Sequence, residues 1–122
     1  MDDIYENLAN AIVIQAFDDY TPACVKVRKR TIMVAQAKER YEAIKAEYDG
    51  IEALHEAAKK KLQKAETKLH RREGLLITAE AEKKSIEDFF SSPWYHMLTK
   101  VDGEVILKEA KKRAKERLEG MA

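Results

Sequence analysis

The fold of this chain is decided by residues 23–72, which read ACVKVRKRTIMVAQAKERYEAIKAEYDGIEALHEAAKKKLQKAETKLHRR. Most of these residues are strong helix formers, chiefly Ala, Glu, Lys, Arg, Gln and Leu, and Asp49-Gly50 interrupts the stretch once. Apolar residues recur at spacings of three and four, as they do along one face of a helix. The stretch therefore predicts long helices that serve as a scaffold or a contact surface.

A seven-residue repeat runs through this stretch and predicts a narrow seam for pairing with another helix. Its members are Val27, Val34, Ala37, Tyr41, Ile44 and Tyr48, and the register continues in Ile51, His55, Ala58, Leu62, Ala65, Leu69 and Arg72. Two architectures are compatible with this continuity. The chain either turns at Asp49-Gly50 into an antiparallel hairpin, or forms one helix of about 50 residues and about 75 Å that pairs with a second copy.

We favour the hairpin. Aspartate followed by glycine is a good helix stop, and the two arms, 22–48 and 51–83, have similar lengths. Folding at Gly50 would therefore return the chain to its starting point. The predicted fold is all-α, a single domain over residues 1–122. In it, residues 1–21 and 84–122 form a small helical base, and residues 22–83 form a coiled-coil-like hairpin insert that projects from the base.

Local signals place the ends of the remaining helices. Ile4, Leu8 and Ile12 share a face of a first helix that we expect to be largely buried. Thr21-Pro22 reads as an N-cap followed by proline at the first helical position, so a second helix should begin there. Gly74 predicts a kink or local break.

The C-terminal third repeats these signals. Ser92-Pro93 is a second cap followed by proline, and it opens a short turn that should point Trp94, Met97 and Leu98 inward. Asp102 can cap a last helix that starts at Gly103 and ends at Gly120, with Val105, Ile106, Ala110, Ala114 and Leu118 on its inner face.

Aromatic residues gather just before and within this short turn, as Phe89, Phe90, Trp94 and Tyr95. The structural interpretation is a small core that joins the first, fourth and last helices. The functional interpretation is a pocket for a partner, because aromatic residues are frequent hot spots in binding sites. Trp94 and Tyr95 are therefore candidate binding residues.

Charge is unevenly distributed, although the net charge is only +1. Residues 1–20 contain five acidic residues and no basic one, whereas Lys26, Arg28, Lys29 and Arg30 put four positive charges into five positions. This cluster is a candidate contact for a phosphate-bearing ligand. Alternatively, it pairs with the nearby Asp18 and Asp19. A further group, Lys59, Lys60, Lys61, Lys64 and Lys68, predicts a face that either engages a partner protein or stays hydrated.

The residues that catalysis requires are not grouped in this chain. His55, His70 and His96 lie on separate segments without a Cys or paired carboxylate at ligand spacing, and phosphate loops and catalytic triads have no counterpart. Cys24 stands beside the basic cluster, which would lower its pKa, but no motif pairs it with a base. We therefore predict no enzymatic activity, no catalytic residues, no cofactor and no metal.

The expected location is the cytoplasm. A single cysteine excludes an intramolecular disulfide and is typical of a reducing compartment. No apolar run approaches the roughly 20 residues of a membrane span, and the acidic start is unlike a signal peptide.

Two stretches near the ends carry a recognisable pattern. They are residues 4–13, IYENLANAIV, and residues 86–95, IEDFFSSPWY, followed by Leu98-Thr99 and by VDGE at 101–104. This pattern resembles a family of small uncharacterised all-helical proteins encoded by phages and mobile elements of Firmicutes. The long middle of the chain departs from that family, as does Ser91, where a basic residue is common.

The resemblance implies a function by analogy. We expect a non-enzymatic effector that binds and inhibits a factor of the host cell, such as a defence nuclease or its nucleotide signal. Its partner would be a host protein or a phosphate-bearing ligand, and we expect no membrane among its partners. Two alternatives stay open: a structural or assembly coiled-coil phage protein that forms a homo-oligomer, and a nucleic-acid accessory protein.

Overall fold

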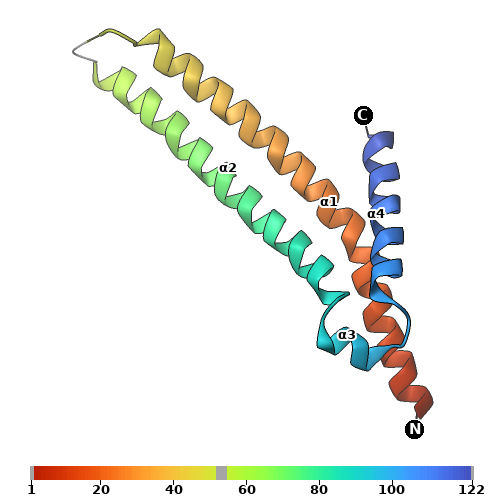
Figure 1. Cartoon of the computed structure of the whole chain (residues 1–122). Helices are drawn as coiled ribbons and strands as arrows, with labels where there is room; N and C mark the ends of the chain where they lie inside the picture. Colours follow the sequence, from red (N-terminus) through yellow and green to blue (C-terminus); the bar gives the residue numbers. More distant parts are fainter. Residues whose placement is uncertain (1, 52–54, 122) are drawn as a thin grey trace. The chain divides into compact units, whose positions relative to one another are not determined.

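The computed structural model describes residues 2–51 and 55–121. Over these residues the chain forms four helices and no strand: α1 (Asp2–Glu47), α2 (Glu56–Phe89), α3 (Pro93–Leu98) and α4 (Gly103–Gly120) (Figure 1). The predicted all-α fold is confirmed. Contacts divide the chain into two compact units, which we call the terminal unit (Met1–Val27 and Glu80–Ala122) and the hairpin unit (Arg28–Ala79).

Helix α1 continues through Pro22, so the predicted boundary at Thr21-Pro22 is wrong. Proline lacks the amide hydrogen that would bond the Asp18 carbonyl, and inside a helix it costs about 3 kcal/mol. Asp18 and Pro22 are both exposed, so water can solvate the freed carbonyl. Tyr20, Ala23 and Cys24 are buried on either side of the proline. We infer that this packing offsets the lost hydrogen bond and keeps the helix continuous.

The first turns of α1 are exposed, contrary to the prediction of a largely buried first helix. Ile4 and Leu8 are 75% and 60% exposed, and between residues 3 and 20 only Ala9 and Tyr20 are buried. An apolar stripe is buried only where another element covers it. The core cluster that joins α1 to α4 begins farther along α1, at Phe17.

Helix α1 ends at Glu47, at the predicted stop. The amides of Tyr48 and Asp49 donate to the carbonyls three residues earlier, and Gly50 has a φ of 79°. Glycine adopts this left-handed conformation without steric cost, which explains why Asp49-Gly50 ends the helix. Ile51 is exposed and outside any helix, so α2 begins at Glu56 rather than at the predicted Ile51. The part of the predicted helix at residues 52–54 lies outside the described residues, and the predicted seam member His55 is exposed and precedes α2.

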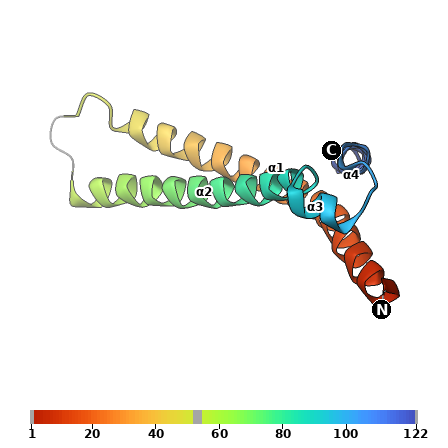
Figure 2. The ribbon, with the colours of Figure 1, turned by 60° about the horizontal axis from the view of Figure 1, so that its bottom comes forward.

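In the hairpin unit, the two helical arms run antiparallel (Figures 1 and 2). Arg72 donates from Nη1 to the Met33 carbonyl at 3.3 Å, and the Lys61 ammonium lies 3.7 Å from a Glu47 carboxylate oxygen. Residue numbers therefore rise on one arm as they fall on the other. The buried side chains of this unit are Ala37, Ile44, Ala65, Leu69 and Ala79, of which the first four are members of the predicted seam.

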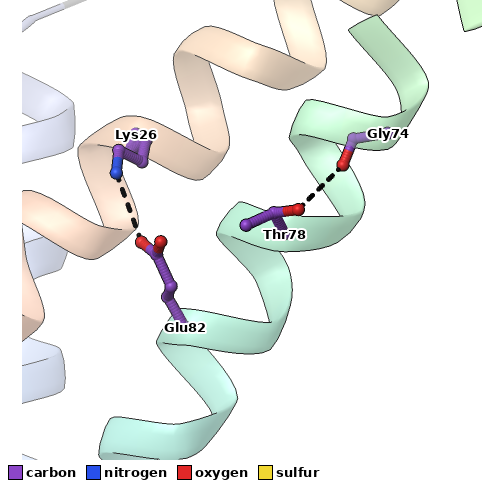
Figure 3. A network of polar contacts seen from close by, with 4 residues as sticks. All are labelled: Lys26, Gly74, Thr78 and Glu82. Atoms are coloured by element: carbon purple, nitrogen blue, oxygen red, sulfur yellow. Dashed lines mark hydrogen bonds and ion pairs between the residues drawn. The ribbon is translucent and has the colours of Figure 1, made fainter. Parts of the chain in front are cut away.

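Gly74 lies inside α2, and the predicted break there is wrong. The helix continues past it, and the Thr78 hydroxyl donates to the Gly74 carbonyl at 3.1 Å (Figure 3). Gly74 is exposed, and a methyl group placed on it would have no heavy atom within 4 Å.

Gly74→Ala is therefore expected to stabilise the protein by about 1 kcal/mol, because alanine loses less backbone entropy than glycine on forming a helix. Urea unfolding followed by circular dichroism would measure the change. A decrease in the free energy of unfolding would show that the backbone at this position is not ordinary helix.

The core of the terminal unit joins α1 to α4. Its buried members are Tyr20 and Cys24 from α1 and Ala110 and Ala114 from α4, against which Phe17, Ile86, Leu107 and Leu118 pack. The Tyr20 hydroxyl donates to the Glu87 carboxylate at 2.6 Å, which ties α1 to α2 as well. Burial, together with this hydrogen bond, raises the pKa of Tyr20 far above its usual range.

Both predicted caps in the C-terminal third are confirmed. The Ser92 hydroxyl accepts from the Tyr95 amide at 3.1 Å, and Pro93 follows as the first residue of α3. The Asp102 carboxylate accepts from the Glu104 amide at 2.9 Å, and α4 ends at Gly120 as predicted. On the expected inner face of α4, Ala110 and Ala114 are buried but Val105 is exposed.

Candidate functional site

A groove in the hairpin unit is lined mainly by positively charged side chains. Its volume is about 740 Å³, and its basic side chains are Arg40 from α1 and Lys60, Lys61, Lys64, Lys68 and Arg71 from α2. The buried residues Ile44 and Ala65 supply an apolar floor, and Gln63 and Thr67 add neutral polar groups. We call this the basic groove.

The sequence places these cations through helical periodicity. Lys60, Lys64, Lys68 and Arg71 follow one another at spacings of four, four and three, so they line one side of α2. Ala65, on the neighbouring face of α2, is buried. Arg40 precedes the buried Ile44 by one turn of α1, and the antiparallel pairing brings it to the same groove.

The electrostatics around this groove favour an anion. Residues 59–72 contain seven Lys and Arg against one Glu, a net charge of +6 with His70 neutral. Lys61 pairs with Glu47, and Lys59 lies 4.0 Å from Glu56. Within ranges 2–51 and 55–121, no carboxylate lies at ion-pair distance from Lys64 or Lys68. Clustered, weakly compensated charges raise the local concentration of anions.

The predicted cluster Lys26, Arg28, Lys29 and Arg30 contributes nothing to the basic groove. Lys26 belongs to the terminal unit, where its ammonium lies 3.2 Å from the Glu82 carboxylate (Figure 3). The sequence predicts Asp18 and Asp19 as the neutralising partners, whereas the structure pairs Lys26 with Glu82. In the hairpin unit, Lys29 is exposed, whereas Arg28 and Arg30 are half-buried.

The two aromatic candidates have different environments. Tyr95 is 0% exposed, and its hydroxyl donates to the Val101 carbonyl at 2.9 Å, so it is a core residue. Trp94 is 54% exposed, and its ring centroid lies 5.4 Å from that of Phe89 in an edge-to-face contact. Met97 is 73% exposed and Leu98 half-buried. The prediction that Trp94 and Met97 point inward is therefore wrong.

Cys24 is buried in the terminal core. Burial raises the pKa of its thiol and outweighs the nearby positive charge of Lys83, which acts in the opposite direction. The expectation that the basic stretch would lower this pKa is wrong.

The basic groove was only partly visible in the sequence. The lysines of α2 form a charged face that helical spacing predicts and that Arg71 extends, but Arg40 joins them only through the pairing of the two arms. Cations spaced by four beside the buried seam residues Ala65 and Leu69 are the signal that points to such a site.

Two other kinds of site have no candidate within residues 2–51 and 55–121. No helix there combines the length and apolarity that a membrane span requires. No three His, Cys, Asp or Glu residues come together there in a way that would hold a metal ion.

Comparison with known proteins finds no matching family model, no similar curated protein and no similar solved structure. The resemblance to a phage and mobile-element family therefore stays a prediction.

Proposed function

We propose that this chain is a non-enzymatic protein that binds the phosphate backbone of double-stranded nucleic acid through the basic groove. The observation that carries the proposal is the convergence of six cationic side chains from two helices on one hollow. Phosphate contacts by Lys and Arg release condensed counterions, which supplies most of the free energy of non-specific nucleic-acid binding.

The size of the groove suits a polymer better than a single nucleotide. Lys60 and Arg71 are eleven residues apart on α2, about 17 Å at the helical rise of 1.5 Å per residue. Over that distance one strand of a duplex presents about five phosphates, at 3.4 Å each along the axis. A mononucleotide would contact only part of the row.

The chemistry of the lining favours a duplex over a single strand. Single-stranded nucleic acid is usually held by bases that stack on aromatic side chains. The lining of the basic groove is instead made of basic, amide, hydroxyl and aliphatic side chains. Four of the six cations are lysines, which act as flexible point charges without the fork geometry of arginine. Such a surface suits contacts to the backbone rather than to base edges.

Lys64→Ala/Lys68→Ala is expected to weaken duplex binding about tenfold at moderate salt, because two phosphate contacts are lost. Fluorescence anisotropy of a short labelled duplex would measure the affinity over a range of salt concentrations. For the unmodified protein, log K should fall with log salt with a slope of about −4.5, as for five contacts. The double variant should reduce the magnitude of that slope by about two.

The matched control is Lys111→Ala/Lys112→Ala, which makes the same change in net charge on the exposed surface of α4. It should leave affinity and slope nearly unchanged. Equal weakening by the two double variants would place binding outside the basic groove, and preference for a single strand of the same length would contradict the duplex assignment.

The basic groove favours the nucleic-acid alternative over an assembly role. Inhibition of a host-defence factor stays a prediction. Binding of nucleic acid is compatible with that prediction but does not imply it. Testing purified protein with duplex alone separates the two, since inhibition requires the host factor and backbone binding does not.

A further inference from the structure

A second groove, in the terminal unit, has a different chemistry. Its volume is about 420 Å³. The residues that line it include Ile12, Ala16 and Asp19 of α1, Ile86 and Phe89 of α2, and Trp94 of α3. Trp94 forms one side of it and is half exposed. We call it the Trp94 groove.

An exposed apolar stripe leads into this groove along α1. Ile4 and Leu8 precede Ile12 at steps of four residues, so the three lie one turn apart along the same side of the helix. Tyr5 adds further exposed aromatic surface beside α3, where its hydroxyl donates to the Met97 carbonyl at 3.4 Å. Contiguous exposed apolar surface of this kind marks an interaction site more often than a free surface.

The charge around the stripe indicates which kind of partner would bind there. Residues 1–20 contain five acidic residues and no basic one, and Asp3, Glu6 and Asp18 are exposed in addition to Asp19 in the groove wall. A second copy that presented the same segment would oppose acid to acid, which costs free energy at an interface. A basic partner would instead gain from complementarity.

We propose that the Trp94 groove and the stripe of Ile4 and Leu8 together bind an amphipathic helix of another protein. A groove between helices accepts such a helix through apolar anchors at positions i, i+3 or i+4, and i+7. Lys and Arg residues on the flanks of the bound helix would face the acidic side chains of α1. This inference is independent of nucleic-acid binding, because it uses none of the residues of the basic groove.

Trp94 provides the measurement, because it is the only tryptophan in the chain. The probe is a synthetic helical peptide with leucines at those anchor positions and lysines elsewhere, and the matched peptide has glutamates in place of the lysines. The lysine peptide should shift Trp94 emission to shorter wavelength in a saturable manner, because a half-exposed indole becomes covered. The glutamate peptide should give no shift at the same concentrations.

Leu8→Lys tests the place of binding without disturbing the core, because Leu8 is exposed. It should weaken binding of the lysine peptide about tenfold, through the loss of one buried apolar anchor and the gain of a like charge. The control Ile77→Lys makes the same change in charge at a 67% exposed site of the hairpin unit and should leave affinity unchanged. Circular dichroism should show both variants folded.

Three results would overturn the proposal. One is the lack of any saturable shift, and another is equal binding of the two peptides, which would indicate non-specific apolar association. The third is a mass measurement showing a dimer that Leu8→Lys dissociates, because the occupant would then be a second copy of this chain.

Discussion

Gly103→Ala is expected to lower the free energy of unfolding by more than about 3 kcal/mol. Gly103 is buried at the start of α4, and a Cβ built on it would overlap the Phe90 carbonyl oxygen. That Cβ would also lie 2.9 Å from the Phe90 carbonyl carbon and 3.1 Å from Cε1 of Tyr95. Backbone atoms cannot rotate away as a side chain can, so the start of α4 would have to shift from the end of α2.

The measurement is urea unfolding of the variant beside Gly74→Ala, which makes the identical chemical change inside α2. The two substitutions should shift the unfolding midpoint in opposite directions, because only Gly103 has a neighbour within reach of the added methyl group. A Gly103 variant as stable as the unmodified protein would contradict the close approach of α4 to Phe90.

Tyr95→Ala is expected to cost about 3 to 5 kcal/mol, the range for deleting a fully buried aromatic side chain. The ring contacts Phe89 and Phe90, with centroids 5.6 and 5.7 Å away, and the hydroxyl bonds the Val101 carbonyl. Removing it would leave a cavity between α2 and α3 and a carbonyl without its donor. Tyr95→Phe should restore most of the stability, since it loses only the hydrogen bond, worth about 1 kcal/mol.

The neighbouring Trp94→Ala serves as the comparison and should cost only about 1 kcal/mol, because the indole is half exposed and makes one edge-to-face contact. Chemical denaturation of the two alanine variants and of Tyr95→Phe would establish the order. If Trp94→Ala proved the more destabilising, the indole would have to be buried and the tyrosine exposed, the reverse of the structure.

Much of the fold could be predicted because its signals are local. The caps at Ser92 and Asp102 each depend on a hydrogen bond to an amide two or three residues away, so a few neighbouring residues contain the whole interaction. The stop at Gly50 depends on one backbone dihedral angle. The seam residues Ala37, Ile44, Ala65 and Leu69 were identifiable because helical periodicity alone places them on common faces.

Several predictions made from local signals were wrong because contacts distant in the sequence decide the outcome. Pro22 carries a strong local signal for a helix start, but packing on both sides of it keeps α1 continuous. Trp94 and Tyr95 are adjacent in the sequence, and both are aromatic residues with one polar group. Only their neighbours in space therefore distinguish the surface residue from the core residue. The exposure of Ile4 and Leu8 likewise depends on where other helices stop covering α1.

The sequence by itself thus determined the helical class, the caps and the turn at Gly50, because hydrogen bonds between close neighbours and side-chain periodicity decide these features. Only the tertiary structure decided the two grooves. Arg40 and Arg71 are 31 residues apart in the chain, and Ile12 and Trp94 are 82 apart, yet each pair lines one hollow. Contacts at such separations arise from the pairing of helices, in which many small burial energies add, and no short stretch of sequence contains them.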